Sequence, residues 1–165
     1  MEGKSEKGLV ELQQGIAALR AQGAGIWLPF RCTMLAEVFD LLGNTEEGLR
    51  SLAEAQTLMD QTEERWWEAE IYRLQGTLLL RHSMAPPAEV ETWLRRALDV
   101  ARRQEARSLE LRAATSLARL WQHQGKHAEA HDLLEPVYDW FTEGFDAPDL
   151  KEAKALLEEF RGKTL

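Results

Sequence analysis

The sequence has a single cysteine, Cys32, so the chain cannot form an internal disulfide bond. Such cysteine usage is typical of proteins from a reducing compartment, and we expect a cytoplasmic protein. Cys32 falls at a small, buried-type position within a stretch of helical periodicity. A catalytic cysteine needs a lowered pKa and a neighbouring base, and the sequence places no base beside it. We therefore interpret Cys32 as a packed thiol.

Basic residues are scarce relative to acidic ones, because 20 Lys and Arg stand against 28 Asp and Glu, a formal net charge of -8. A nucleic-acid-binding domain usually has the opposite balance, so we expect no nucleic-acid partner. Long hydrophobic runs are missing as well. The run at 78–80 ends at Arg81, far short of the ~20 residues of a membrane span, and we expect no membrane partner.

Recognisable catalytic and cofactor motifs are also absent. The GKS segment at 3–5 matches only the end of a P-loop, and the sequence lacks the earlier glycine of that motif. Three histidines are spaced four residues apart, at His123, His127 and His131. On one helix they could hold a metal, but Gly125 interrupts the helix between the first two. We predict a chain that is not an enzyme, with no catalytic residue, no metal-binding residue and no cofactor.

Apolar residues recur instead at helical spacing along the chain, and no stretch shows the period-two alternation of a β-strand. Glycine and proline mark the expected breaks between helices, at Gly23 to Gly25, Gly43, Met84 to Pro87, Gly125 and Gly144. One helix is expected from Glu64 to His82, and Asn44 and Ser108 are predicted N-caps. The sequence thus predicts an all-α chain of about eight helices.

Small and large residues recur in register between three helix pairs. In the first helices the matching positions are Ala36, Gly76 and Ala118, then Phe39, Leu79 and Trp121, at separations of 40 and 42 residues. In the second helices they are Leu52, Leu94 and Leu134, then Ala55, Ala97 and Val137. Leu12 and Gly15 extend these last columns upstream. The pattern, clearest in Leu111–Val137, is that of tetratricopeptide (TPR) units. It predicts a right-handed superhelical stack of antiparallel helix pairs, with a generic helical bundle as the alternative.

The repeat alignment divides one TPR-like domain, 1–165, into five parts. Residues 1–24 form an orphan second helix of a repeat, and three repeats follow at 28–60, 64–104 and 107–141. A C-terminal capping helix is expected at 146–162. Gly76 lies inside a helix, where glycine costs ~1 kcal/mol relative to alanine. We therefore expect a neighbouring helix to approach closely at Gly76, and expect Ala118 to be buried in the same way.

Three stretches closely resemble the C-terminal TPR region of large bacterial regulators: ERWWEAEIYRLQGTLLL (64–80), RRALDVARRQEARSLELRAATSLARLW (95–121) and VYDWFTEGFDAPDLKEAKALLEE (137–159). Those regulators join a class III adenylate/guanylate cyclase or a DNA-binding domain to an AAA-type ATPase and then to helical repeats. The resemblance implies a signalling or scaffolding region. It brings no catalytic residues, because the cyclase and ATPase motifs belong to other domains, and it leaves open whether the chain is a stand-alone protein or a fragment.

In TPR stacks the first helix of each pair lines a concave groove. The residues that we expect there, as a partner-binding site, are Glu37, Glu70, Arg73, Thr77, Arg112, Arg119 and Gln122. Arg73, Arg112 and Arg119 would place a basic strip in an acidic protein, able to bind carboxylates of a peptide. The alternative is that Arg73 or Arg112 pairs with Glu70 or Glu37 of an adjacent helix.

These observations favour a non-enzymatic module that binds a protein or peptide in bacterial signalling or regulation, and the arginine strip would suit an acidic segment of that partner. Two alternatives stay open: a ligand-sensing module for a small anion or nucleotide, and a structural oligomerisation module. The apolar residues of the first helix, from Leu9 to Leu19, predict a homodimer through that end. Most tryptophans, including Trp93, Trp121 and Trp140, fall at core spacing. Trp66 does not, since it cannot share a helix face with Trp67, and it is a candidate contact residue.

Overall fold

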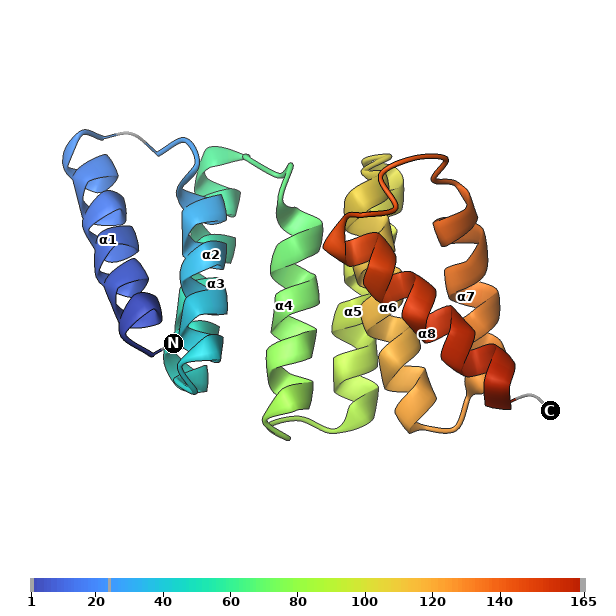
Figure 1. Ribbon diagram of the computed structural model, residues 1–165. Helices are drawn as coiled ribbons and strands as arrows, with labels where there is room; N and C mark the ends of the chain where they lie inside the picture. Colours follow the sequence, from blue (N-terminus) through green and yellow to red (C-terminus); the bar gives the residue numbers. More distant parts are fainter. Residues whose placement is uncertain (1, 24, 164–165) are drawn as a thin grey trace.

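The computed structural model describes residues 2–23 and 25–163, and the side chains of 7–23 and 25–162. Within this part the regular structure is all α-helical, with no strand (Figure 1). The eight helices are α1 (Glu2–Ala21), α2 (Leu28–Leu41), α3 (Thr45–Thr62), α4 (Glu68–Arg81), α5 (Pro87–Arg103), α6 (Arg107–His123), α7 (His127–Asp139) and α8 (Pro148–Lys163). In the described part of the chain, none of them combines the length and the apolar content that crossing a membrane would require.

The helices form two rows. Successive helices run in opposite directions, and short loops join them at two opposite edges of the stack (Figure 1). Besides packing on its sequence neighbours, α4 contacts both α2 and α6, and α6 contacts α8. Among the described residues no comparable contacts join α3 to α5 or α5 to α7. The row α2, α4, α6 and α8 is therefore the inner side of the stack, and α3, α5 and α7 form the outer side.

The core follows the repeat alignment. Within the three repeats, every residue of the four aligned columns is buried, from Ala36 and Phe39 in α2 to Leu134 and Val137 in α7. At Gly76 a Cβ atom would lie only 3.0 Å from Leu94 Cγ and Cδ2. The backbone of α4 therefore packs directly against the Leu94 side chain of α5. Gly76 and Ala118 are thus buried as predicted. The small residues let the helices approach, and the large residues fill the spaces between them.

Turn residues end the helices near the expected positions. Gly43 and Gly125 have φ angles of 76° and 77°, the left-handed conformation of a helix C-terminus. The expected start of α4 at Glu64 is wrong, because α4 begins at Glu68. Residues 64–67 instead form a connection whose tryptophans pack against the start of α2.

Of the two predicted N-caps, Ser108 is wrong and Asn44 is confirmed in position. Ser108 is not an N-cap: Ala106 takes that position and α6 starts at Arg107. The reason is the end of the preceding helix. Glu105 adopts a left-handed conformation, and the Ala106 N–H bonds back to the Ala101 carbonyl, so the chain re-enters a helix earlier. Asn44 does occupy the N-cap position of α3, but its side chain makes no capping hydrogen bond.

The first helix forms a smaller core of its own with α2. Ile16 is buried against α2, and Leu9, Leu12 and Leu19 are partly buried beside it. Gly15 is exposed, with open space beside its Cα, so the upstream extension of the repeat column does not enter the core. Helix α2 covers much of this apolar face, while Val10 stays half exposed. The homodimer through the first helix stays a prediction.

Candidate binding cleft

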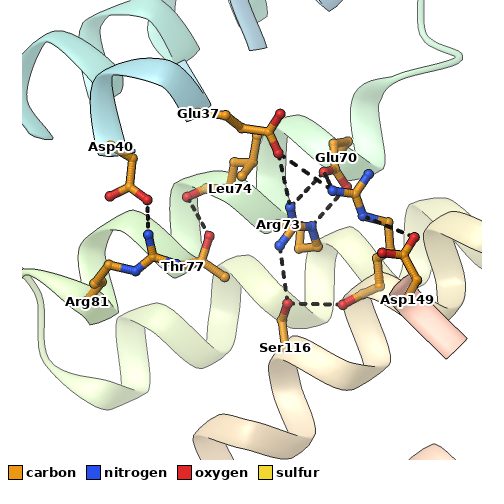
Figure 2. Close-up of polar contacts among 10 residues, drawn as sticks. Glu37, Asp40, Glu70, Arg73, Leu74, Thr77, Arg81, Ser116 and Asp149 are labelled. Carbon is orange, nitrogen blue, oxygen red and sulfur yellow. Dashed lines mark hydrogen bonds and ion pairs between the residues drawn. The ribbon is translucent and has the colours of Figure 1, made fainter. Parts of the chain in front are cut away.

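The inner row of helices encloses a cleft of about 930 Å³. Its lining combines apolar side chains of α2 and α4, among them Leu74 and Leu80, with charged groups of all four inner helices. Of the predicted groove residues, the ones that line it are Glu37, Arg73, Thr77 and Arg119. The Thr77 hydroxyl donates to the Leu74 carbonyl oxygen at 3.1 Å, so this hydroxyl is already paired within α4 (Figure 2).

Arg73 and Glu70 form a buried, bidentate ion pair beside the cleft (Figure 2). Arg73 Nε donates to Glu70 Oε2 at 2.9 Å, and Nη2 donates to Oε1 at 2.7 Å. The two side chains are only 12% and 2% exposed. Burial lowers the pKa of Arg73, while the hydrogen bonds and charge of Glu70 raise it, and the net direction is upward. This pairing fixes the guanidinium and leaves it little capacity for an outside ligand.

Arg112 of α6 joins the same cluster. Its Nη2 lies 2.7 Å from Glu70 Oε1 and 3.6 Å from Glu37 Oε1, and its Nε lies 3.8 Å from Asp149 Oδ2 of α8. Two arginines therefore face three carboxylates. Partial burial, followed by repulsion from Glu70, raises the pKa of Glu37 above its ordinary value of 4.5, and the arginines only partly offset this.

The other charged groups of the cleft are paired across helices as well. Asp40 of α2 binds Arg81 (Figure 2). The Oδ1 atom of Asp40 also lies 2.9 Å from His82 Nε2. Arg119 of α6 donates to Glu152 of α8 at 3.0 Å, with both side chains about half exposed. Gln122 extends the contact between these helices, because its side-chain amide donates to Glu159 at 2.7 Å.

The predicted basic strip is therefore not free. Arg73 and Arg112 pair with Glu70 and Glu37, which is the alternative that the sequence left open. Along the cleft three arginines stand against three carboxylates, so the lining has no excess positive charge. Sequence reasoning missed the acidic residues of α8, because it treated 146–162 as a cap. In the structure α8 continues the inner row, and its Glu152 lines the cleft.

The three histidines do not meet at one site. His123 lines the cleft at the end of α6, whereas the His127 ring lies 6.2 Å from the Phe160 ring at the start of α7. His131 lies near Asp132 and Glu135 on the outer row. Among the described residues no group of three or more potential ligands is close enough to hold a metal.

The cysteine and the tryptophans separate into buried and exposed groups. Cys32 is fully buried, and burial raises its pKa to about 11, as suits a packed thiol. Trp121 is buried, but Trp140 is 56% exposed, so its assignment to the core was wrong. It lies beyond the end of α7, where the apolar periodicity no longer describes a helix. Trp66 is 40% exposed.

Comparisons with known proteins identify the fold. A protein from Podosopora anserina described as a kinesin light chain with nearly identical TPR-like repeats superimposes with a TM-score of 0.63, over 98% of this chain and 87% of its own, at 18% identity. A second crystal structure of it gives the same values. The similarity confirms the predicted all-α, TPR-like stack of helix pairs.

Sequence comparison finds a much longer relative. An uncharacterised protein of Rhizobium meliloti (strain 1021) is 32% identical over 113 residues, which make up 68% of this chain. The matched stretch spans only 11% of that relative's length. No protein-family model matches the chain.

Proposed function

We propose that this chain is a non-enzymatic interaction module that binds a peptide or protein segment in the cleft between α2, α4, α6 and α8. The observation that carries the proposal is the cleft itself. It has about 930 Å³ of space, apolar side chains in its lining and charged walls held in place by ion pairs between helices. A segment entering such a site would meet fixed groups, which lowers the ordering cost of binding.

The charge arrangement favours a segment of mixed charge over a purely acidic one. Arg119 is half exposed and its partner Glu152 is equally accessible, so a carboxylate of the bound segment could replace Glu152 there. At the other end, Glu37 carries a carboxylate whose burial is incompletely compensated by Arg73 and Arg112. A basic side chain of the segment would supply the missing cation at Glu37.

This arrangement is less suited to a small anion or nucleotide. Such a ligand would need Arg73 and Arg112 together, and both are already bound to Glu70 at hydrogen-bond distance. Releasing them would leave Glu70, which is 2% exposed, as a buried uncompensated charge. A peptide that uses the outer groups, Glu37 and Arg119, avoids this cost.

We also propose that the module belongs to a bacterial regulatory protein. The resemblance of 64–80, 95–121 and 137–159 to the repeat region of multidomain regulators supports this context. The match to a short part of a long bacterial protein is what such a region would give. In that setting the cleft would connect a regulator to a partner protein.

The test is affinity capture from the source cells with the parent chain and with Arg119→Ala. Loss of one exposed charge contact weakens binding by about 1 kcal/mol, or roughly fivefold, and the loss should shrink as salt is added. Arg161→Ala is the matched control, because Arg161 also joins α8 to a neighbouring helix through a half-exposed glutamate at 3.0 Å, but outside the cleft.

Both variants are first checked for unchanged helicity and melting temperature. A partner that is retained by Arg161→Ala and weakened by Arg119→Ala supports the proposal. A partner that binds both variants as tightly as the parent, at low salt, does not use the cleft.

A further inference from the structure

Four aromatic rings meet where the start of α2 approaches the connection into α4, away from the cleft. Trp27 and Trp66 lie edge to face, with ring centroids 5.1 Å apart and planes at 70°. The Phe30 ring also contacts Trp66 and Trp67, with ring centroids 5.5 and 5.1 Å apart. Trp27 is 54% exposed and Trp66 40%. The two indoles therefore form a partly exposed aromatic wall that contacts Phe30 and Trp67.

A carboxylate is fixed beside this wall. The backbone N–H of Trp27 donates to both oxygens of Glu64, at 3.1 and 3.0 Å, and Trp66 Nε1 donates to Oε1 at 2.8 Å. Together with Ile26 and Thr62, these residues line a pocket of about 460 Å³. One negative charge thus lies at the ring edge of Trp66 and beside the backbone of Trp27.

The backbone of Trp27 is held in an unusual conformation to make this contact. Its φ angle is 71°, in the left-handed region that a bulky side chain rarely adopts. The same conformation places the Trp27 N–H on Glu64. These hydrogen bonds join the connections at 25–27 and 64–67, and the conformation of Trp27 that they accompany costs of order 1–3 kcal/mol.

Arginine side chains make cation–π contacts with other tryptophans of the chain, but not with Trp27 or Trp66 in the described residues. Arg95 lies 5.1 Å from the ring centroid of Trp121, and Arg107 lies 5.4 Å from that of Trp140. Within the described residues no arginine or lysine lies over Trp27 or Trp66. The neighbouring Arg65 is engaged with Asp60 and Glu68 instead.

We propose that Trp27, Trp66 and Glu64 form a binding site for a quaternary ammonium group. Aromatic faces attract such cations, and a fixed carboxylate adds charge complementarity. Both Glu64 oxygens already accept N–H groups, so the carboxylate offers charge more than free hydrogen-bonding capacity. This favours a cation without N–H donors over an ammonium or guanidinium group. The site is independent of the cleft.

The test compares choline with 3,3-dimethylbutan-1-ol, its neutral isostere of the same shape. Binding is followed by the indole N–H signals of the intact chain in a two-dimensional NMR spectrum, and Trp66→Phe assigns the Trp66 signal. We expect saturable shifts at Trp66, with choline bound about three- to thirtyfold more tightly than the isostere. A peptide containing trimethyllysine, set against its unmodified form, shows whether the group comes from a small molecule or a protein.

Glu64→Gln should weaken the binding of choline and leave the binding of the neutral isostere unchanged, so the preference for choline should shrink to what the indole faces supply. Glu63→Gln is the matched control, because it removes the same charge from the adjacent exposed residue, outside the pocket lining. Melting temperatures verify that both variants fold. Equal binding of choline and the isostere, equal effects of the two substitutions, or no saturable shift at Trp66 with choline or the trimethyllysine peptide would each overturn the proposal.

Discussion

At the scale of single residues, Glu70 and Glu37 have opposite roles in one charge cluster. Glu70 is 2% exposed and accepts hydrogen bonds from Arg73, while Arg112 lies 2.7 Å away. Glu70→Gln should therefore lower the free energy of unfolding by about 3 kcal/mol or more, since it leaves a buried guanidinium uncompensated. Glu37→Gln should leave stability at neutral pH unchanged or slightly higher. Chemical denaturation of the two variants gives this comparison directly.

The pH dependence of the Glu37 variant follows from the raised pKa of Glu37. The folded state binds this proton more tightly than the unfolded state, so ionised Glu37 opposes folding. This penalty is fully present above the folded pKa and disappears as the pH falls toward the ordinary value of 4.5. Any advantage of Glu37→Gln over the parent should thus fade on acidification. An advantage that grows as the pH falls would contradict the assignment.

Residue-level reasoning from the sequence places Arg73, Arg112 and Arg119 on the inner row, where the structure has them. It does not tell which carboxylates reach them. Glu70 lies one turn from Arg73 on α4, so that pairing was foreseeable as an alternative. Asp149 and Glu152 belong to α8, and their position depends on packing across the stack. Trp27 carries no sequence signal at all, because a left-handed tryptophan has no characteristic pattern.

At the scale of helices, Gly76 allows α4 and α5 to pack closely. A Cβ at this position would lie 3.0 Å from two carbon atoms of Leu94 and 3.3 Å from Trp93 Cβ. Gly76→Leu should overpack this contact and cost about 1–3 kcal/mol or more. The measurement is the melting temperature or the free energy of unfolding. An unchanged stability would mean that the repeat alignment fails in this pair.

Gly15→Leu is the matched control for Gly76→Leu. Gly15 also lies within a helix, α1, but a Cβ there would meet no atom within 4 Å. Leucine has the higher helix propensity, so this variant should keep or gain stability, by up to ~1 kcal/mol. The contrast between the two variants separates packing from propensity.

Helix positions are the part of the fold that sequence predicts well, because apolar periodicity and turn residues are local signals. Gly43 and Gly125 mark turns correctly for this reason. The start of α4 was misplaced because Glu64–Trp67 has helical composition but forms tertiary contacts with α2 instead. The contribution of α8 to the cleft could not be predicted, because the position of Glu152 beside Arg119 depends on packing between α6 and α8.

At the scale of the whole molecule, the stacked helices place two candidate binding surfaces in different parts of the structure. The inner row carries the cleft, with its paired charges. Several large exposed side chains lie instead in loops along one edge, where an outer helix leads to the next inner helix (Figure 1). They are Ile26, Trp27, Trp66, Trp140 and Phe145. A partner segment in the cleft and a ligand at this edge would therefore not compete for the same residues.

The central claim is that a partner segment binds along the inner row. The most direct measurement replaces Thr77 with a photo-crosslinking amino acid and, in a second variant, Thr92 in the same way. Thr77 lines the cleft, whereas Thr92 is exposed on outer helix α5. The two variants therefore replace the same residue type, one on the inner row of helices and one on the outer row. On irradiation in the source cells, we predict a discrete protein adduct from Thr77 that Thr92 does not give. An adduct from Thr92 and none from Thr77 would contradict the account.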